Sequence, residues 1–208
     1  MNIIDVVDFT GQDSAIDYNG HGTFVTGILS STNEECLGIA PDAEIYILKL
    51  FTDENVTYSS WFIDAFNFVL DNNIDIVNLS TATKDSQDVP FMEKINELTA
   101  AGVIFVSAIG NDGPTPGSAE NPGDMPTVIG VGSLSSSLDD VAYFSSRGMT
   151  KNSLLNGFGV PKPDILLPGE NILSLGLNGH RCELKQGTSF SVPIMTGSIA
   201  IALSALDK

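Results

Sequence analysis

The sequence predicts an α/β fold in three layers, with a doubly wound, mostly parallel sheet that carries helices on both faces. Short runs rich in β-branched residues alternate with segments of helical spacing, which is typical of parallel strands joined by helices. The segment Val103–Ile109 is unusually apolar, as expected for a strand covered on both faces. The 208 residues, 42% of them hydrophobic, can bury one substantial core, so we expect one domain over residues 1–208.

The N-terminal half contains three predicted elements before the first long helix. A short β-branched run predicts a strand at Ile3–Phe9. A helix is expected to begin at His21, because small residues flank the histidine and an apolar segment follows. Alternation of apolar and polar residues predicts a strand at Ile45–Phe51, and apolar residues at helical spacing predict a helix over Tyr58–Asn72.

The remaining elements follow the same alternation. A strand is expected at Ile74–Leu79, and a helix over Phe91–Ala101 that ends at Gly102, a favourable C-terminal glycine. A Gly- and Pro-rich loop follows residue 114. Beyond it the pattern predicts three further strands, at Thr127–Val131, Ala142–Phe144 and Asp164–Leu167.

Ser189 lies at the expected start of the last helix, between a Gly-Thr turn and the apolar segment Ile194–Leu206. Backbone N–H groups at a helix N-terminus stabilise negative charge, which suits a nucleophile. Pro193 is expected in the first turn, where a proline gives up only a hydrogen bond that is not made anyway. Because a hydroxyl is a weak nucleophile, this interpretation requires a base elsewhere in the chain.

The chain has two histidines, and His21 is the candidate base. It lies in Gly20-His21-Gly22-Thr23, directly before an apolar segment. His180 lies in a loop before the nucleophile and is predicted to be a surface turn residue. A turn at His21 and an N-cap at Ser189 explain each motif separately, whereas their joint presence indicates nucleophilic catalysis.

These motifs resemble those of the subtilisin-like serine proteases, whose histidine motif reads His-Gly-Thr and whose serine motif reads Gly-Thr-Ser with a proline shortly after. The segment Ser107–Pro114 resembles the family's oxyanion-asparagine segment, and Ile74–Ser80 resembles its substrate-lining strand. The resemblance covers essentially the whole chain, in the right order. It implies a serine endopeptidase that hydrolyses peptide bonds by acyl-enzyme chemistry.

The resemblance implies three catalytic residues. Ser189 would attack the peptide carbonyl, and His21 would remove its proton and later deliver it to the leaving amine. The side-chain amide of Asn111 would stabilise the oxyanion together with the Ser189 N–H. By local sequence alone, Asn111 is equally well explained as a turn residue in Asn-Asp-Gly-Pro.

A protein or peptide substrate is expected to bind as an extended strand that adds to a sheet edge. Relatives usually have a pair of small residues where this chain has Ala82 and Thr83, which affects the shape of the pockets. The expected substrate-binding residues are Asn78, Ser80, Thr81, Ala82, Ser107, Ala108 and Gly110.

The sequence departs from the family at the triad aspartate, since it contains no Asp-Thr-Gly or Asp-Ser-Gly. Matching the family backward from His21 places residues 2–10 on the strand after that aspartate, so Asp5 and Asp8 are rejected. Asp17 is expected to be structural. We therefore expect a truncated catalytic domain that lacks its first strand and the orienting carboxylate, and that is weakly active or inactive by itself.

Composition limits the partners. Nine basic and 26 acidic residues give a net charge of -17, which disfavours nucleic acid and anionic membranes and favours cationic substrates. Solubility alone explains most of these carboxylates equally well. Cys36 and Cys182 lack metal-ligand spacing, so they form one long-range disulfide or remain two free thiols. No cofactor or metal is expected. Calcium is compatible with the family, but no site is identifiable.

The segment Val192–Leu206 is interrupted by polar residues and is not expected to span a membrane. The resemblance implies a place in the secretory pathway, in the Golgi or endoplasmic reticulum lumen, with membrane attachment only through segments outside these residues.

The absent aspartate keeps a non-catalytic, peptide- or partner-binding relative as an alternative. A nucleotide-binding domain is disfavoured, because no Gly-x-Gly-x-x-Gly follows a first strand and no Gly-Lys-Ser/Thr occurs.

Overall fold

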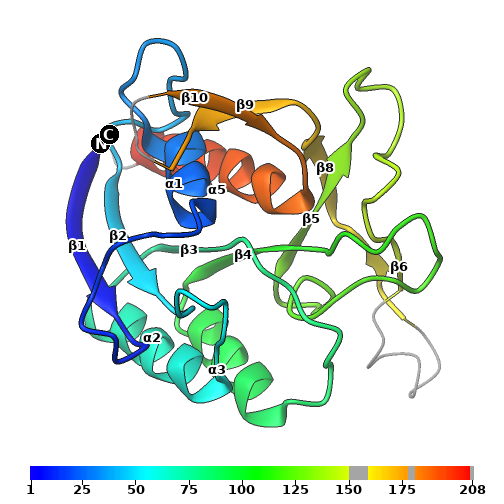
Figure 1. Cartoon of the computed structure of the whole chain (residues 1–208). Coiled ribbons are helices and arrows are strands. Elements are labelled where there is room, and N and C mark those ends of the chain that lie inside the picture. The colour runs from blue at the N-terminus through cyan, green and yellow to red at the C-terminus, as the bar shows by residue number, and fades with distance from the viewer. Residues whose placement is uncertain (150–158, 178–180, 207–208) are drawn as a thin grey trace.

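A computed structural model describes residues 1–149, 159–177 and 181–206 (Figure 1). Its central sheet has four parallel strands in the order β3-β4-β5-β8. The β-branched runs of the sequence supply these strands, as predicted. Their bounds are Ile76–Leu79 (β3), Ile104–Ala108 (β4), Ile129–Leu134 (β5) and Ile165–Pro168 (β8).

Helices cover both faces of this sheet, which confirms the expected three-layer α/β architecture (Figure 1). The helices α2 (Ser59–Asp71) and α3 (Val89–Ala100) lie on one side. The helices α1 (His21–Ser30) and α5 (Thr188–Leu206) lie on the other, where α5 packs against all four strands and against α1.

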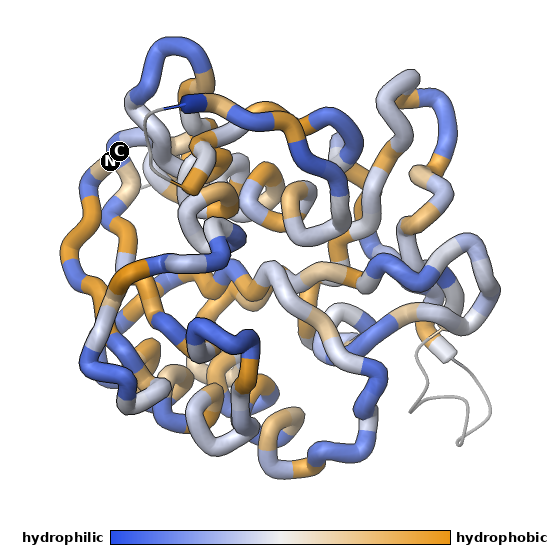
Figure 2. Tube along the Cα trace, viewed as in Figure 1, coloured by the Kyte–Doolittle hydropathy of each residue, from blue (hydrophilic) through white to orange (hydrophobic). Residues whose placement is uncertain are grey.

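Two further parallel strands, β1 (Asn2–Asp8) and β2 (Glu44–Lys49), form a separate two-stranded sheet. Within the described residues no ladder joins β2 to β3. Figure 2 colours much of β1, at the left edge of the view, as hydrophobic, although its side chains are largely exposed. The described parallel strands therefore form two separate sheets, and the expected absence of a first strand stays a prediction.

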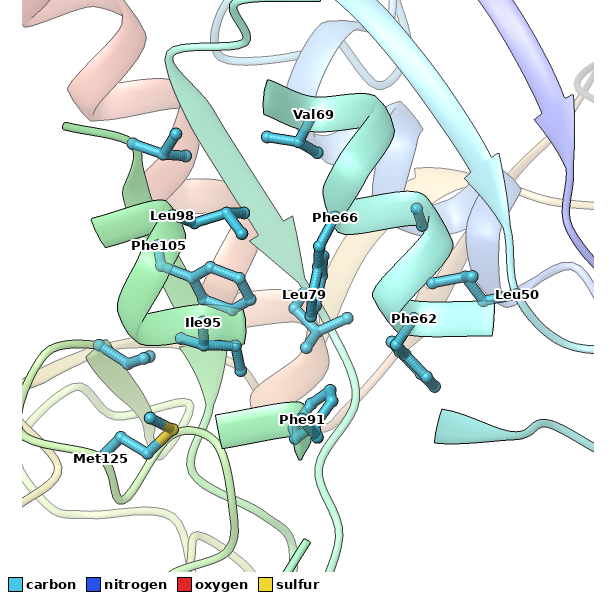
Figure 3. Packing of buried hydrophobic residues seen from close by; sticks show 13 residues of the cluster. Leu50, Phe62, Phe66, Val69, Leu79, Phe91, Ile95, Leu98, Phe105 and Met125 are labelled. Atoms are coloured by element: carbon cyan, nitrogen blue, oxygen red, sulfur yellow. The ribbon is translucent and has the colours of Figure 1, made fainter. Parts of the chain in front are cut away.

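The largest apolar cluster lies between the sheet and the helices α2 and α3 (Figure 3). Phe66 of α2 meets Phe105 of β4 edge to face, with ring centroids 5.5 Å apart. Ile95 and Leu98 of α3 are fully buried beside them. A smaller cluster on the opposite face includes Val192 of α5, so the four-stranded sheet is covered on both faces.

Three expectations about local structure are corrected. Residues 142–144 form a turn rather than a strand: the Ser145 N–H bonds back to the Ala142 carbonyl, and only Val141 bridges to Leu134. The helix α5 begins at Thr188, earlier than expected, so Pro193 lies inside it and not in its first turn. The sequence pattern also missed two short antiparallel pairs, β6 (Gly148–Met149) with β7 (Pro161–Lys162), and β9 (Ile172–Leu175) with β10 (Cys182–Lys185).

The two cysteines form a disulfide, which settles the alternative that the sequence left open. Cys36 follows α1 and Cys182 begins β10, with Cα atoms 6.1 Å apart across a sequence separation of 146. In the described part of the chain, α5 is the one helix that is long and apolar enough to cross a membrane by length and composition. It packs against the sheet and α1, as an interior helix of a globular domain does.

Candidate active site

The three residues that the sequence singled out lie on one cleft of about 810 Å³. His21 begins α1, Ser189 lies in the first turn of α5, and Asn111 follows the end of β4 closely. The cleft also extends between β2 and β3, where Ile45 to Leu50 form one side and Asn78 and Leu79 the other. The parallel sheet therefore brings together side chains from opposite ends of the chain.

Asn111 is held by the residue before the serine. Its Oδ1 accepts a hydrogen bond from the Thr188 N–H at 2.9 Å and lies 3.1 Å from the Thr188 hydroxyl. Because Oδ1 is occupied, Nδ2 is the end of the amide left to donate. A Cβ on Gly187 would come within 3.8 Å of this Nδ2, and Gly187 has φ +150°, a conformation that favours glycine. The amide and the start of α5 are thus fixed relative to each other.

Ser189 is half-buried at the N-terminus of α5, where helical N–H groups have no intrahelical acceptor. Such N–H groups favour negative charge close to them. With the Asn111 amide beside it, this end of the cleft offers two kinds of donor to an oxyanion.

His21 is half-buried beside Phe190, with ring centroids 5.8 Å apart. Burial lowers the pKa of His21 below its usual 6.5; Asp17 opposes this shift and Lys185 adds to it. A lowered pKa keeps the imidazole neutral at neutral pH, which is the form a general base requires. In the described part of the chain, no hydrogen bond joins the His21 ring to the Ser189 hydroxyl or to a carboxylate.

Asp17 is structural, as predicted. Its carboxylate accepts hydrogen bonds from the Gly20 N–H at 2.7 Å and from the Thr23 N–H and hydroxyl at 2.8 Å each, which stabilises the start of α1. Burial alone would raise the pKa of Asp17, and these hydrogen bonds more than offset that effect, so its pKa lies below 3.8. Asp5 and Asp8 do not line the cleft, which agrees with their rejection as triad members.

Six of the seven expected substrate-binding residues line the cleft, and Ser107 does not. Ser107 is fully buried, and its hydroxyl donates to the Thr81 carbonyl at 3.4 Å, so it supports the wall of the cleft from behind. The Asn78 side chain accepts from the Thr196 hydroxyl and donates to Ser80, both at 3.0 Å, which ties β3 to α5. The lining residues are Asn78, Ser80, Thr81, Ala82, Ala108 and Gly110.

Sequence reasoning missed Glu120, which also lines the cleft. No local motif marks it, because its position depends on pairing between segments that are distant in sequence. His180 lies outside the described residues. Among the residues that the structure describes, no group of three or more His, Cys, Asp or Glu side chains could hold a metal ion.

A serine at a helix N-terminus, an imidazole and an anchored amide line one cleft of an α/β sheet, an arrangement that is typical of subtilisin-like proteins. The chain belongs to the Subtilase family, whose family model matches residues 4–208. Over 207 residues it is 44% identical to the membrane-bound transcription factor site-1 protease of Homo sapiens, which covers 100% of this chain. Over 201 residues, which are 97% of this chain, it is also 44% identical to the subtilisin-like protease SBT6.1 of Arabidopsis thaliana.

Solved structures agree with this membership. A cold adapted subtilisin-like serine proteinase matches 98% of this chain and 68% of its own, with a TM-score of 0.81 and 25% sequence identity. The chain spans only 19% of the length of site-1 protease and of SBT6.1. The comparisons therefore establish the family and the fold of these residues.

Proposed function

We propose that this chain is the catalytic part of a serine endopeptidase that resembles site-1 protease and processes protein substrates such as proproteins or transcription factors. The observation that carries the proposal is the single cleft that His21, Asn111 and Ser189 share. Membership of the Subtilase family and 44% identity to site-1 protease support it.

In this proposal the Ser189 hydroxyl attacks the scissile carbonyl while His21 accepts its proton, and His21 then protonates the leaving amine. The acyl-enzyme is released by a water that His21 activates in the same way. The Asn111 amide and the Ser189 N–H stabilise the oxyanion, and loss of one such donor typically costs about 3 kcal/mol of transition-state stabilisation.

The orienting carboxylate is proposed to come from a segment upstream of Met1, on a strand that would lie between β2 and β3. The cleft between these strands and the absence of a described carboxylate on the His21 ring support this placement. Residues 1–208 alone would then be weakly active or inactive, because loss of the aspartate typically lowers turnover about 10⁴-fold. The absence of a described carboxylate on the His21 ring also favours a second candidate function, a non-catalytic subtilase-like protein that binds peptides or a partner.

The substrate is proposed to bind as an extended strand along Ser80 to Ala82, which line the cleft next to β3. We place the protein in the lumen of the secretory pathway, in the Golgi or endoplasmic reticulum. Likeness to a membrane-bound relative supports this location, as does the Cys36–Cys182 disulfide, since disulfides persist in oxidising compartments. Any membrane attachment would come from segments outside these residues.

Covalent labelling with a fluorophosphonate tests the proposal. The full-length protein should be labelled at Ser189, and Ser189→Ala should abolish the labelling. Residues 1–208 alone should react about 10⁴-fold more slowly, because no carboxylate among the described residues bonds to the His21 ring. A full-length protein that binds peptides but resists the reagent would instead support the non-catalytic function.

A further inference from the structure

The sequence contains two Asn-x-Ser/Thr triplets, the acceptor pattern for N-linked oligosaccharides. One is Asn55-Val56-Thr57, in the loop between β2 and α2, and the other is Asn78-Leu79-Ser80, at the end of β3. The pattern is short enough to occur by chance, so the surroundings of each asparagine decide whether the folded chain can carry a glycan. These surroundings differ between the two triplets.

Asn55 lies in a tight, exposed loop. Its N–H donates to the Thr52 carbonyl, and the Thr52 N–H donates to the Val56 carbonyl, both at 2.9 Å. Asn55 has a φ of +61°, in the left-handed region that asparagine adopts more readily than most residues. Because Asn55 is exposed, a large group attached to its side chain would not disturb the packing of the fold.

The side-chain amide of Asn55 is oriented for such an attachment. Its Oδ1 accepts a hydrogen bond from the Asn19 Nδ2 at 3.3 Å. Its own Nδ2, the atom that would carry the sugar, donates to no group in the part of the chain that the structure describes. Asn55 and Asn19 both line the cleft, and Asn19 is two residues before His21. An oligosaccharide on Asn55 would therefore stand at the rim of the proposed active site.

The hydroxyl of Thr57 provides independent support. It is buried and makes no hydrogen bond to any of the described residues. A buried hydroxyl without a partner costs stability, and a valine would fill nearly the same space without that cost. An unpaired buried group calls for an explanation outside the stability of the fold. Glycosylation gives one, because it requires a hydroxyl two residues after the acceptor asparagine.

Asn78 is unsuited to the same modification. It is half-buried at β3, where its Oδ1 accepts from the Thr196 hydroxyl and its Nδ2 donates to the Ser80 hydroxyl, both at 3.0 Å. Asn78 and Ser80 both line the cleft. An oligosaccharide on this Nδ2 would displace the Ser80 hydroxyl and fill the cleft itself.

We infer that Asn55 is N-glycosylated and that Asn78 is not. The modification depends on the proposed location in the secretory pathway, where the donor is a lipid-linked oligosaccharide pyrophosphate. A bond forms between Asn55 Nδ2 and the anomeric carbon of the first sugar, and the bond from that carbon to the pyrophosphate oxygen breaks. Nδ2 loses one proton, and the lipid pyrophosphate is the leaving group.

Expression of the full-length protein in eukaryotic secretory cells, followed by peptide N-glycosidase F, provides the test. The enzyme should leave an aspartate at residue 55, which peptide mass spectrometry locates, whereas residue 78 should remain asparagine. Thr57→Val should abolish the modification at residue 55, and the matched Thr57→Ser should keep it. Thr57→Val should also unfold at a temperature no lower than that of the deglycosylated wild type, because it removes an unpaired buried hydroxyl.

The disulfide separates failure of this inference from failure of the proposed location, since the Cys36–Cys182 bond persists in an oxidising compartment. A protein that contains the bond but has an unmodified Asn55, or a glycan on Asn78, would overturn the inference while the location stands. A protein with two free thiols and no glycan would overturn both. Fluorophosphonate labelling of Ser189 reports the protease function separately.

Discussion

The four-stranded sheet and the two-stranded sheet are built from similar sequences but differ in burial. Strands β4 and β5 contribute Val106 and Val131, both fully buried between helices. Strand β1 is just as rich in isoleucine and valine, yet Ile3 is 42% exposed and Ile4 47% exposed. Burial of a parallel strand therefore depends on the layers that cover it and on its neighbours in the sheet, and β1–β2 lacks a ladder to β3. The stability of the chain should be concentrated in the four-stranded half.

The comparison predicts a large difference between matched substitutions. Ile95→Ala should lower the free energy of unfolding by about 2–5 kcal/mol, because Ile95 is fully buried on the face of α3 that packs into the largest apolar cluster. Ile4→Ala removes the same atoms from an exposed position and should cost no more than about 0.5 kcal/mol. Urea unfolding of both variants of the chain measures the difference. Equal losses would mean that β1 is covered in solution.

Removing the disulfide should have the next largest effect. The bond joins the segment after α1, a helix that lines the cleft, to β10, which pairs with β9. The double variant Cys36→Ser/Cys182→Ser should unfold about 2–5 kcal/mol more easily. A reducing agent should lower the thermal midpoint of the wild type to that of the variant and leave the variant unchanged. A wild type insensitive to reduction would contradict the role of the bond.

The connection from β1 to α1 should depend on Asp17. Asp17→Asn weakens the hydrogen bonds to Gly20 and Thr23 and should cost about 0.5–2 kcal/mol. The pKa of Asp17 is lower in the folded chain than in the unfolded one, so its stabilisation is present above pH 3.8 and is lost as pH falls through the folded pKa. Asp13→Asn, in the same loop, provides the control and should have little effect. A loss that is independent of pH would argue against the carboxylate as the cause.

The smallest expected effect concerns His21. Burial lowers its pKa in the folded chain, so the unfolded chain binds more protons just below pH 6.5. The free energy of unfolding should therefore decrease as pH falls from about 6.5 toward the folded pKa, by a small part of its full value. Between pH 5 and 8, the free energy of unfolding should change less with pH for His21→Gln than for the wild type. Parallel curves would show that His21 is as solvated in the folded chain as in the unfolded one.

Much of the fold could be predicted, because every helix and most parallel strands bury one or both faces and so carry a periodic pattern. The β9–β10 pair could not, since Leu173 and Leu184 are exposed and its role is to pack beside α1. Residues 142–144 look apolar enough for a strand, but a hydrogen bond from Ser145 closes them into a turn.

The residues of the candidate site also fall into two groups, those that the sequence could single out and those that it misplaced or missed. His21 and Ser189 stand in short motifs whose neighbours are sequential, so sequence alone could single them out, and the structure places both on one cleft. Ser107 was misplaced because its exposure depends on the pairing of β4, which buries it behind Thr81. Glu120 was missed because its surroundings come from Gly110 and from the pairing of Asn121 with Thr83, which no local pattern encodes.

The Cys36–Cys182 bond has a further consequence for any cut in the backbone between the two cysteines. His21 precedes the first cysteine and Ser189 follows the second, so both lie outside the loop that the bond closes. A cut anywhere between the cysteines leaves the two terminal pieces covalently joined. A molecule cut between the cysteines would therefore keep His21 and Ser189 in one covalently linked protein. Its two pieces would separate on a denaturing gel only after reduction of the disulfide.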